Sequence, residues 1–304
     1  MRIIVTGGAG FIASHIVDAY IAKGHHVAVI DNLSTGFRRN LNPRARFYKA
    51  DICNQKLLEH IFEKERPEIM NHHAAIASVI ASIANPNATF EANVLGTVNL
   101  LRAFGAHGKG KNRKIIFAST GGAIYGTPRK LPAPEATLPM PSSPYGLSKL
   151  LAEETIAFYA RTSHFAHTIL RYANVYGPRQ NPKGEAGVVS IFAELMRQGN
   201  QPRIFGDGSK TRDYVYVADI ARANVAALTK GNGETINLGT GIMTSDKEVF
   251  GAVAQALKFR GTPQYAPFRS GEVNKISLDA RRARRVLNWK PRVSFEEGVR
   301  RTVS

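Results

Sequence analysis

The chain has 304 residues, of which 43% are hydrophobic and 21% charged, a composition typical of a globular protein with a sizeable core. No stretch approaches about 18 uninterrupted apolar residues, which argues against a membrane-spanning helix. The formal net charge of +18 suits anionic ligands. The basic residues are dispersed, without a zinc finger, RNP motif or heptad array, which argues against nucleic acid as the main partner.

Short apolar runs alternate with helical patterns over the first 240 residues. An amphipathic helix is predicted over 11–22, where Ile12, Ile16, Ala19 and Tyr20 share one face. The runs expected to form strands are residues 2–6, 26–30, 46–50, 69–74, 114–119, 167–173 and 235–239. Strands that alternate with helices predict an α/β fold, a doubly wound parallel sheet with helices on both faces.

Beyond residue 173 the sequence becomes richer in Gly, Pro and polar residues, as in 174–187 and 262–273. We therefore expect two parts. Residues 1–173, with 211–240 returning to them, should form a nucleotide-binding domain, and 174–304 should form mainly a smaller α/β C-terminal lobe that binds substrate.

A glycine-rich turn follows the first predicted strand. Gly7, Gly10 and Ala13 are spaced G-x-x-G-x-x-A between that strand and the helix over 11–22. In this context the glycines let the backbone approach a diphosphate, and the helix N-terminus supplies unpaired N–H groups. The pattern predicts a Rossmann-type dinucleotide site.

A carboxylate ends the second predicted strand. Asp31 stands some twenty residues beyond the glycines, where it can accept hydrogen bonds from an adenosine ribose. Because it would repel a 2′-phosphate, NAD is favoured over NADP. Asp51 and Ile52, which end the third strand, are expected either to flank the adenine or to form a simple turn.

Tyr145 and Lys149 stand four residues apart at the start of a predicted helix, so their side chains project from one face. Tyrosine has an ordinary pKa near ~10 and is a poor base at neutral pH, but a nearby ammonium and a cationic nicotinamide favour its phenolate. Tyr145 is therefore a candidate general base. Two hydroxyls, Ser119 and Thr120, end the strand that lies between this pair and the glycine turn.

At this point the chain resembles the extended short-chain dehydrogenase/reductase family, and within it the UDP-hexose 4-epimerases. The resemblance runs nearly end to end. It rests on the segments TGGAGFIASH, DNLSTG, NHHAAIASV, FEANVLGTVNLL, ASTGGAIYG, YGLSK, LRYANVYGPR, FGDGSKTRDYVYVAD and FRSGEV.

The resemblance also gives a reason for the missing acid after the hydroxyls. Family members that dehydrate or decarboxylate a nucleotide sugar carry acids where this chain has Gly122 and Ala123, just before Tyr125. Hydroxyls suffice for a reaction that only removes and returns a proton and a hydride. The expected reaction is 4-epimerisation of a UDP-hexose (UDP-glucose or UDP-galactose) through a transient 4-keto sugar, with Tyr145 as base and tightly bound NAD. Thr120 is the expected catalytic hydroxyl, and Ser119 competes because the glycine pair shifts the alignment by one residue.

Further site residues are implied by the same resemblance. The residues expected to contact NAD are Gly7, Gly10, Phe11, Ile12, Asp31, Asn32, Ser34, Thr35, Gly36, Asp51, Ile52, Ala74, Ala75, Asn93, Tyr145 and Lys149. Those expected to bind the UDP-sugar are Asn174, Val189, Phe205, Arg212, Arg269, Glu272 and Ile276, with Ile276 as a gatekeeper beside the sugar's 2-substituent. A homodimer through helices near 93–107 and 147–161 is also implied.

Several alternatives stay open. The chain could act on UDP-N-acetylglucosamine or UDP-glucuronate as another 4-epimerase, be a dehydratase, or be an inactive NAD-sensing or nucleic-acid-binding scaffold. No metal site is expected, and His15, His72 and His73 are expected to be structural. The single cysteine, Cys53, excludes an internal disulfide framework and fits a reducing cytoplasm, and no signal peptide is predicted. The preferred sugar and the reason for the +18 charge do not follow from the sequence.

Overall fold

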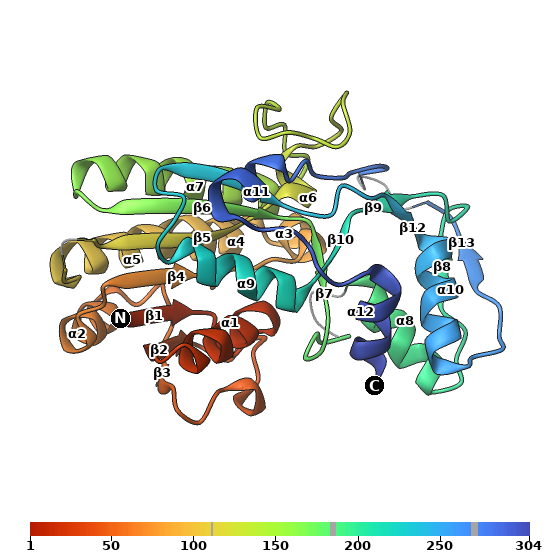
Figure 1. Ribbon diagram of the computed structural model, residues 1–304, viewed down its shortest axis with the longest axis horizontal. Coiled ribbons are helices and arrows are strands. Elements are labelled where there is room, and N and C mark those ends of the chain that lie inside the picture. The colour runs from red at the N-terminus through yellow and green to blue at the C-terminus, as the bar shows by residue number, and fades with distance from the viewer. Residues whose placement is uncertain (111, 183–186, 269–272) are drawn as a thin grey trace.

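The computed structural model describes residues 1–110, 112–182, 187–268 and 273–304. Seven strands form one parallel sheet in the order β11-β6-β5-β4-β1-β2-β3 (Figure 1). Their bounds are β1 Arg2–Thr6, β2 His26–Asp31, β3 Arg46–Lys49, β4 Ile69–His72, β5 Lys114–Thr120, β6 Ala166–Tyr172 and β11 Glu234–Leu238. All seven predicted strands are present, and the doubly wound sheet is confirmed.

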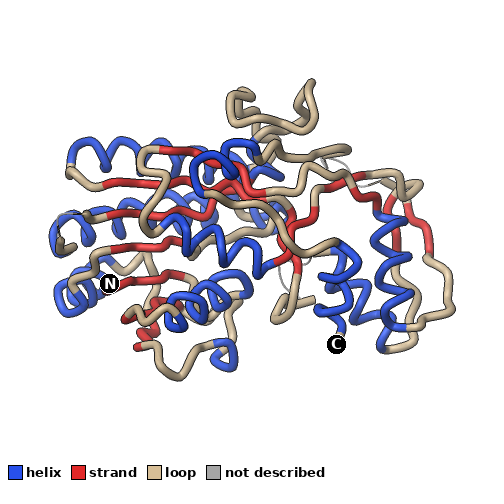
Figure 2. Tube along the Cα trace, in the orientation of Figure 1, coloured by secondary structure: helices blue, strands red, loops and turns tan. Residues whose placement is uncertain are grey.

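Helices cover both faces of this sheet (Figure 2). Helix α1 Phe11–Ala22 has the predicted bounds and packs with α9 Val217–Ala227 and α11 Arg281–Leu287 on one face, around core residues such as Ile16, Tyr20 and Ile220. The other face carries α2 Gln55–Glu65, α5 Gly96–His107 and α7 Pro144–Thr162, around Leu58, Leu100 and Ile156. The apolar sides of all these helices are thereby buried against strands that are apolar on both faces.

Short elements lie at the carboxyl edge of the sheet. They are η1 Arg38–Asn40, α3 Val79–Ala84, α4 Pro86–Phe90, the π-helical turn η2 Glu91–Leu95 and α6 Gly121–Ile124. Strand β1 has β2 on one side and β4 on the other, so the chain reverses its direction of travel across the sheet at this point. In open α/β sheets, ligands bind at the carboxyl ends of the strands beside such a point.

A smaller lobe stands at one end of the sheet, on the right in Figure 1. It contains three two-stranded ladders and three helices: β7 Asn174–Tyr176 with β10 Tyr214–Tyr216, β9 Thr211–Arg212 with β12 Thr244–Ser245, β8 Arg203–Phe205 with β13 Gln264–Ala266, and α8 Val188–Arg197, α10 Asp246–Leu257 and α12 Phe295–Val303. A separate apolar cluster that includes Tyr176, Phe192 and Val253 forms its core. Residues 276–289 pack on the sheet instead, so α11 belongs with the larger lobe although it lies beyond residue 240.

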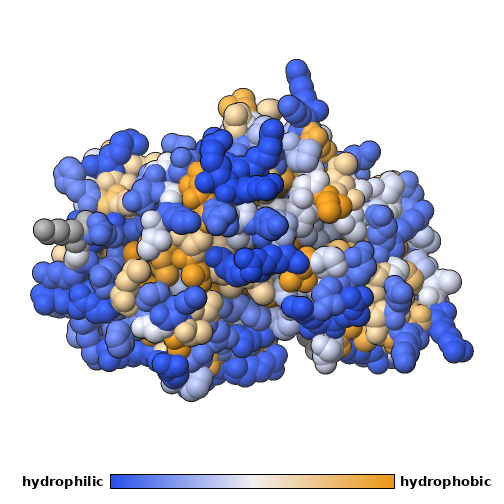
Figure 3. Space-filling view, viewed as in Figure 1, coloured by the Kyte–Doolittle hydropathy of each residue, from blue (hydrophilic) through white to orange (hydrophobic). Residues whose placement is uncertain are grey.

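The molecular surface over α11 is covered mainly by hydrophilic side chains, whereas the surface over α9 is a mixture of hydrophilic and hydrophobic side chains (Figure 3). In the described part of the chain, no helix is both long enough and apolar enough to cross a membrane.

Candidate active site

The glycine turn places the N-terminus of α1 at the carboxyl edge of the sheet. Gly7 has φ +70°, and a Cβ there would lie 2.8 Å from the backbone nitrogen of Ala74. Only glycine fits at this close approach of two loops. The Gly10 N–H donates to the Gly7 carbonyl at 2.9 Å, and α1 begins directly after Gly10. The turn therefore presents the helix N-terminus that an anionic group requires.

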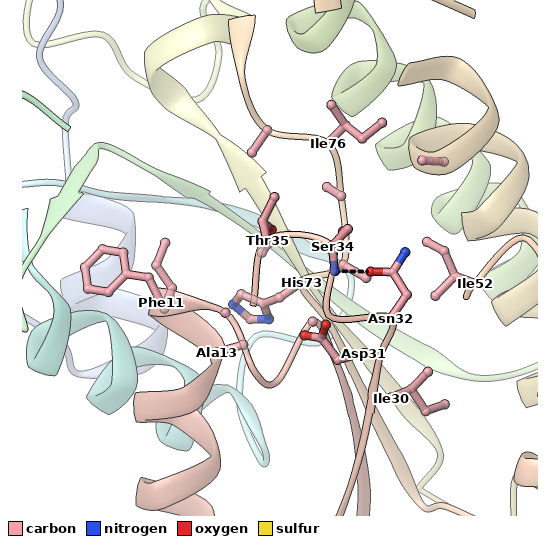
Figure 4. A pocket seen from close by; sticks show the side chains of 18 of the residues that line it. Phe11, Ala13, Ile30, Asp31, Asn32, Ser34, Thr35, Ile52, His73 and Ile76 are labelled. Atoms are coloured by element: carbon pink, nitrogen blue, oxygen red, sulfur yellow. Dashed lines mark hydrogen bonds between the residues drawn. The ribbon is translucent and has the colours of Figure 1, made fainter. Parts of the chain in front are cut away.

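A cavity of about 510 Å³ opens at the ends of β1, β2, β4 and β5. This volume is in the usual range for a small-molecule or cofactor site. Side chains from all four strand ends surround it, as Figure 4 shows for Asp31, His73 and their neighbours. The predicted residues that line it are Gly7, Gly10, Phe11, Ile12, Asp31, Asn32, Ser34, Thr35, Asp51, Ile52, Ala74, Ala75, Ser119, Tyr145 and Lys149.

The Asp31 carboxylate is held by backbone groups at the rim of this cavity. Its Oδ2 accepts from Ala9 N at 3.0 Å and its Oδ1 accepts from Leu33 N at 2.8 Å. Each oxygen keeps a further lone pair for a ligand hydroxyl. Burial raises the pKa of Asp31, and the two backbone N–H groups counteract part of that rise. Asn32 beside it accepts from Ser34 N at 2.9 Å (Figure 4) and donates to Asp51 at 2.9 Å.

Tyr145 and Lys149 project from the first two turns of α7. Ser143 caps the helix by accepting from Gly146 N at 3.2 Å, which fixes where α7 begins. The Lys149 ammonium donates to the Ala118 carbonyl at 2.8 Å and lies 4.6 Å from the centre of the Phe117 ring. Burial, and next the charge of Lys149, lower the pKa values of both His72 and His73. The ammonium is therefore fixed to the end of β5, near His72, which ends β4, and His73, which follows it.

The two strand-end hydroxyls differ in their hydrogen bonds. The Ser119 hydroxyl donates to Glu153 Oε1 at 2.5 Å, while Thr120 accepts from Ala123 N at 3.2 Å as the N-cap of α6. Glu153 also receives Arg171 Nε at 2.9 Å and Nη2 at 2.5 Å, so it is an ionised acceptor and Ser119 must be the donor. The proton of Ser119 is thus committed to Glu153, whereas that of Thr120 is not used in its cap bond.

A buried polar network stands behind this pair of hydroxyls. Arg171 Nη1 donates to the Tyr125 hydroxyl at 2.9 Å, and Tyr125 donates to Asn237 Oδ1 at 2.8 Å. The Asn237 amide donates to the Ala133 carbonyl at 3.0 Å. The network joins β5, α7, β6 and β11, and it fixes the strand end that carries both hydroxyls.

Gly122 lies in the space in front of Thr120. A Cβ at this position would be 3.3 Å from Asn174 Oδ1 and 3.9 Å from Thr120 Oγ1. A side chain at residue 122 would therefore reach the place where Thr120 and Asn174 come together. Gly122 is one of the two positions, with Ala123, at which the sequence resemblance implies an acid in dehydrating enzymes, and here it holds no side chain.

Two predicted cofactor residues lie behind the cavity wall. Gly36 packs against Ala9, from which a Cβ would be 2.9 Å distant. Asn93 is buried, accepts from Ile76 N at 2.8 Å and donates to the Ser148 hydroxyl at 2.9 Å. Asn93 therefore holds the backbone of the cavity-lining segment and does not line the cavity itself.

The predicted substrate residues that the structure describes do not line this cavity. Asn174 faces Gly122, and Arg212 Nη1 donates to the carbonyls of Thr211 at 2.9 Å and Asn274 at 3.3 Å. Phe205 is partly buried on β8 of the small lobe. Arg269 and Glu272 lie outside the described residues.

Val189 and Ile276 differ from the prediction. Val189 is 0% exposed in the small-lobe core, and Ile276 is 1% exposed in the core of the sheet lobe. The isolated bridges Lys275–Thr211 and Leu278–Ala133 hold the backbone on either side of residue 276. The structure thus places Ile276 in the core and not on a pocket wall, because a register counted along a loop does not fix which way a side chain points.

The cavity-lining residues that sequence reasoning missed include His73, Tyr172, Arg179, Gln180 and Asn181. His73 was expected to be structural, yet its ring projects among the cavity-lining side chains (Figure 4) and its Nε2 bonds Tyr172 at 3.0 Å. Residues 179–181 come from a loop that follows β7. An arginine in a segment rich in Gly and Pro, soon after the sixth strand of the sheet, was the available signal.

Comparison with known proteins agrees with this geometry. The family model described as "NAD dependent epimerase/dehydratase family" matches residues 3–239. The chain is 48% identical to a putative UDP-glucose 4-epimerase of Methanocaldococcus jannaschii, over 99% of this chain and 97% of that protein. It is 42% identical to a UDP-glucose 4-epimerase of Mycolicibacterium smegmatis, over 100% and 97% of the two chains.

Two solved structures are similar over the whole chain. A UDP-glucose 4-epimerase of Thermotoga maritima with UDP-glucose is 47% identical, with TM-score 0.97 over 100% of this chain and 97% of that one. A Thermus thermophilus UDP-glucose 4-epimerase in complex with NAD is 43% identical, with TM-score 0.94 over 100% and 98%. The fold, the glycine turn and these matches together show that the chain belongs to the NAD dependent epimerase/dehydratase family.

Proposed function

We propose that this protein is a UDP-glucose 4-epimerase that interconverts UDP-glucose and UDP-galactose with a tightly bound NAD. The observation that carries the proposal is the end of β5. Ser119, Tyr145 and Lys149 line the cavity there, and Thr120, which follows Ser119, caps α6 without lining the cavity. Glycine occupies position 122 in front of Thr120. Relatives and structures that cover the whole chain, and that are named for the same activity, support it.

The cavity fits NAD. The Gly7–Gly10 turn and the N-terminus of α1 suit a diphosphate, and Asp31 suits the adenosine ribose without a 2′-phosphate. When bound there, NAD would supply the hydride acceptor for the hydrogen on the sugar C4 and, once reduced, the hydride donor for the 4-keto sugar. Cofactor released from the purified protein by denaturation should therefore be NAD and not NADP.

The chain's own residues handle the proton and the orientation. Tyr145 takes the proton from the sugar 4-hydroxyl and gives it back after the 4-keto sugar has turned over. Lys149, fixed at the Ala118 carbonyl, places a positive charge one helical turn from Tyr145 and favours its phenolate. Thr120 donates to the same sugar oxygen or relays its proton, because its cap bond uses only a lone pair. Ser119 donates its proton to Glu153 and therefore does not relay the proton of the sugar 4-hydroxyl.

In the described part of the site, Gly122 and Ala123, where the resemblance implies the acids of dehydrating enzymes, offer no acid for the elimination of water. A dehydratase removes a proton and a hydroxyl from neighbouring carbons and needs an acid near the leaving hydroxyl. Residue 122 is glycine, and Asn174 and Thr120 are the side chains nearest to a Cβ built there. This arrangement favours epimerisation over dehydration.

The direct experiment is to incubate purified protein with UDP-galactose without added cofactor and to resolve the nucleotide sugars that form. UDP-glucose should appear, and the same equilibrium mixture should be reached from UDP-glucose. UDP-N-acetylglucosamine, UDP-glucuronate and dTDP-glucose serve as competing substrates. Preferred turnover of one of these, or formation of a 4-keto-6-deoxy sugar, would refute the proposed substrate or reaction.

We also expect a homodimer. Large apolar side chains are exposed on α7 and on the elements packed against it: Ile80, Ile83, Leu95, Leu147, Leu151 and Phe158, at 40–69%. Leu147 and Leu151 stand one turn apart on α7, so an apolar stripe runs along that helix. Light scattering should give twice the chain mass, and Leu151→Glu together with Phe158→Glu should give the monomer.

A further inference from the structure

The loop after β7 runs along α1 beside the glycine turn. Phe11, His15 and Asp18 lie on one face of α1, at spacings of four and three residues. His15 Nε2 lies 2.9 Å from the carbonyl oxygen of Pro178, and Arg179 Nη1 lies 2.8 Å from Asp18 Oδ2. A carbonyl only accepts, so His15 Nε2 carries a proton. The loop is thereby fixed against the first two turns of α1, the end of the helix at which a diphosphate binds.

Arg179 also lines the cofactor cavity. Among the cavity-lining residues that the structure describes, the lysine and arginine side chains are Lys149 and Arg179. Lys149 donates to the Ala118 carbonyl at the end of β5, on the catalytic side. The cavity also contains three carboxylates, of Asp31, Asp51 and Glu91. Arg179 is therefore the cation available to an anionic group at the α1 end.

The backbone of Arg179 is in an unfavourable conformation. Its φ is +69°, in the left-handed region that side chains other than Gly, Asn and Asp rarely adopt. Conformations of this kind persist when the surrounding structure enforces them, and they gather at ligand clamps and active sites. Here Gln180, the next residue, is held by a bond from its Nε2 to the Val175 carbonyl at 3.2 Å.

The pairing of Arg179 with Asp18 is weak and replaceable. Both side chains are 34% exposed, and ion pairs at such exposure contribute little to stability. Asp18 has a second partner, because its Oδ1 accepts from Asn42 Nδ2 at 2.7 Å. Asp18 can thus release Arg179 and keep its own position.

We propose that Arg179 clamps the cofactor diphosphate, exchanging Asp18 for a phosphate oxygen when the cavity fills, and that Asp18 holds the guanidinium ready while the cavity is empty. Arginine suits this task because its planar, always charged fork bonds phosphate oxygens in pairs. The clamp adds a contact from the loop after β7, far in sequence from the glycine turn. It would help to retain the cofactor, which must stay bound through each catalytic cycle.

The test compares three variants of the full-length protein. Arg179→Asn removes the guanidinium and keeps a residue that tolerates the left-handed conformation. Arg66→Asn is the matched control, because Arg66 is exposed, has φ +45° at the end of α2 and does not line the cavity. Asp18→Asn removes the waiting partner. The measurements are the release rate of bound cofactor and calorimetric binding of ADP-ribose, adenosine and UDP to cofactor-stripped protein.

Loss of a charged hydrogen bond should weaken ADP-ribose binding by about 10- to 100-fold in Arg179→Asn and speed cofactor release to match. Adenosine and UDP binding should stay within about twofold, as should all three ligands in Arg66→Asn. Asp18→Asn should bind ADP-ribose as tightly as the unaltered protein or more tightly.

Three results would overturn the clamp. Arg179→Asn could bind ADP-ribose as tightly as Arg66→Asn does, or it could lose affinity for UDP or adenosine instead of ADP-ribose. Asp18→Asn could weaken ADP-ribose binding as much as Arg179→Asn does, which would mean that the Arg179–Asp18 ion pair supports the shape of the cavity and that Arg179 does not bind the diphosphate. The inference rests on the proposed function, and the two fail differently. If the unaltered protein binds neither NAD nor ADP-ribose, the proposed function fails; if it binds them and Arg179→Asn does so equally, only the clamp fails.

Discussion

The two lobes keep their shape by different means. In the sheet lobe, seven paired strands lie between two apolar layers, and the groups at its carboxyl edge are tied to strand backbone or to buried charges, as Lys149 is to Ala118 and Ser119 to Glu153. In the small lobe the strands form ladders of two, and the core is rich in aromatic rings. The ring centroids of Tyr176, Tyr214 and Phe295 lie 5.3–6.2 Å apart.

Buried aspartates join the small lobe to the rest of the chain. Asp213 accepts from the backbone of Thr240, Gly241 and Leu278 at 2.8–3.1 Å, and burial raises its pKa. Asp219 accepts from Arg292 N and Val293 N at 3.0 and 3.2 Å. The carboxyl edge of the sheet therefore holds the expected catalytic side chains in place. The residues expected to bind the substrate lie in the small lobe, whose loops are held by a few hydrogen bonds. Substitutions in the first region should therefore change kcat, and those in the second should change KM.

The largest effect is expected for Tyr145→Phe at the sheet edge. Removing the general base should lower kcat by about 10²-fold or more, with the fold and bound NAD retained. Steady-state rates with UDP-galactose and the cofactor content measure this. Tyr159→Phe, on the same helix, is the control and should keep normal turnover. A near-normal kcat in Tyr145→Phe would show that Tyr145 is not the general base.

Thr120→Val should lower kcat by about 10²-fold, because the hydroxyl that can donate is lost at similar volume. Ser119→Ala should lower kcat by less than about tenfold, because Ser119 already gives its proton to Glu153. Parallel kinetics on the two variants make the comparison. The reverse order of effects would transfer the relay to Ser119.

Arg212→Met probes the small lobe. If this guanidinium binds the substrate diphosphate, KM should rise by about tenfold while kcat stays within about threefold. Arg203→Met, at an exposed site on β8, is the control. A fall in kcat with unchanged KM would contradict the division of roles between the lobes.

The smallest effect concerns His73 in the sheet lobe, which should make the free energy of unfolding decrease as the pH falls. Burial, and next Lys149, lower the pKa of His73 to about 3, against an unfolded value near 6.5. As the pH falls from 6.5 the unfolded chain gains a proton that folded His73 does not, so the unfolding free energy decreases by about 1.4 kcal/mol per pH unit for this residue. Urea denaturation at stepped pH should show a shallower slope for His73→Gln; an unchanged slope would mean that His73 is protonated in the folded state.

Much of the sheet lobe could be predicted because its signals are local. Apolar runs bounded by turns identified the seven strands, and helical periodicity gave α1 its bounds. The glycine turn placed a cavity at the end of β1. Arg179 could not be predicted as a cavity residue, because its position depends on the contact of its loop with α1, more than 150 residues earlier in the chain. The prediction for Ile276 failed because its segment has two isolated bridges and no regular strand or helix, so the sequence offers no periodicity that tells which side chains are buried.

The closeness of Gly122, Thr120 and Asn174 bears on how such an enzyme could change its chemistry. An acid at residue 122 would bring its Cβ to 3.3 Å from Asn174 Oδ1, tighter than ordinary contact, so Asn174 would have to shift. Gly122→Asp alone should therefore disturb the existing reaction before it supports a new one. Positions 122 and 174 are therefore coupled, and a route from epimerisation to elimination through an acid at residue 122 requires Asn174 to move or to be replaced.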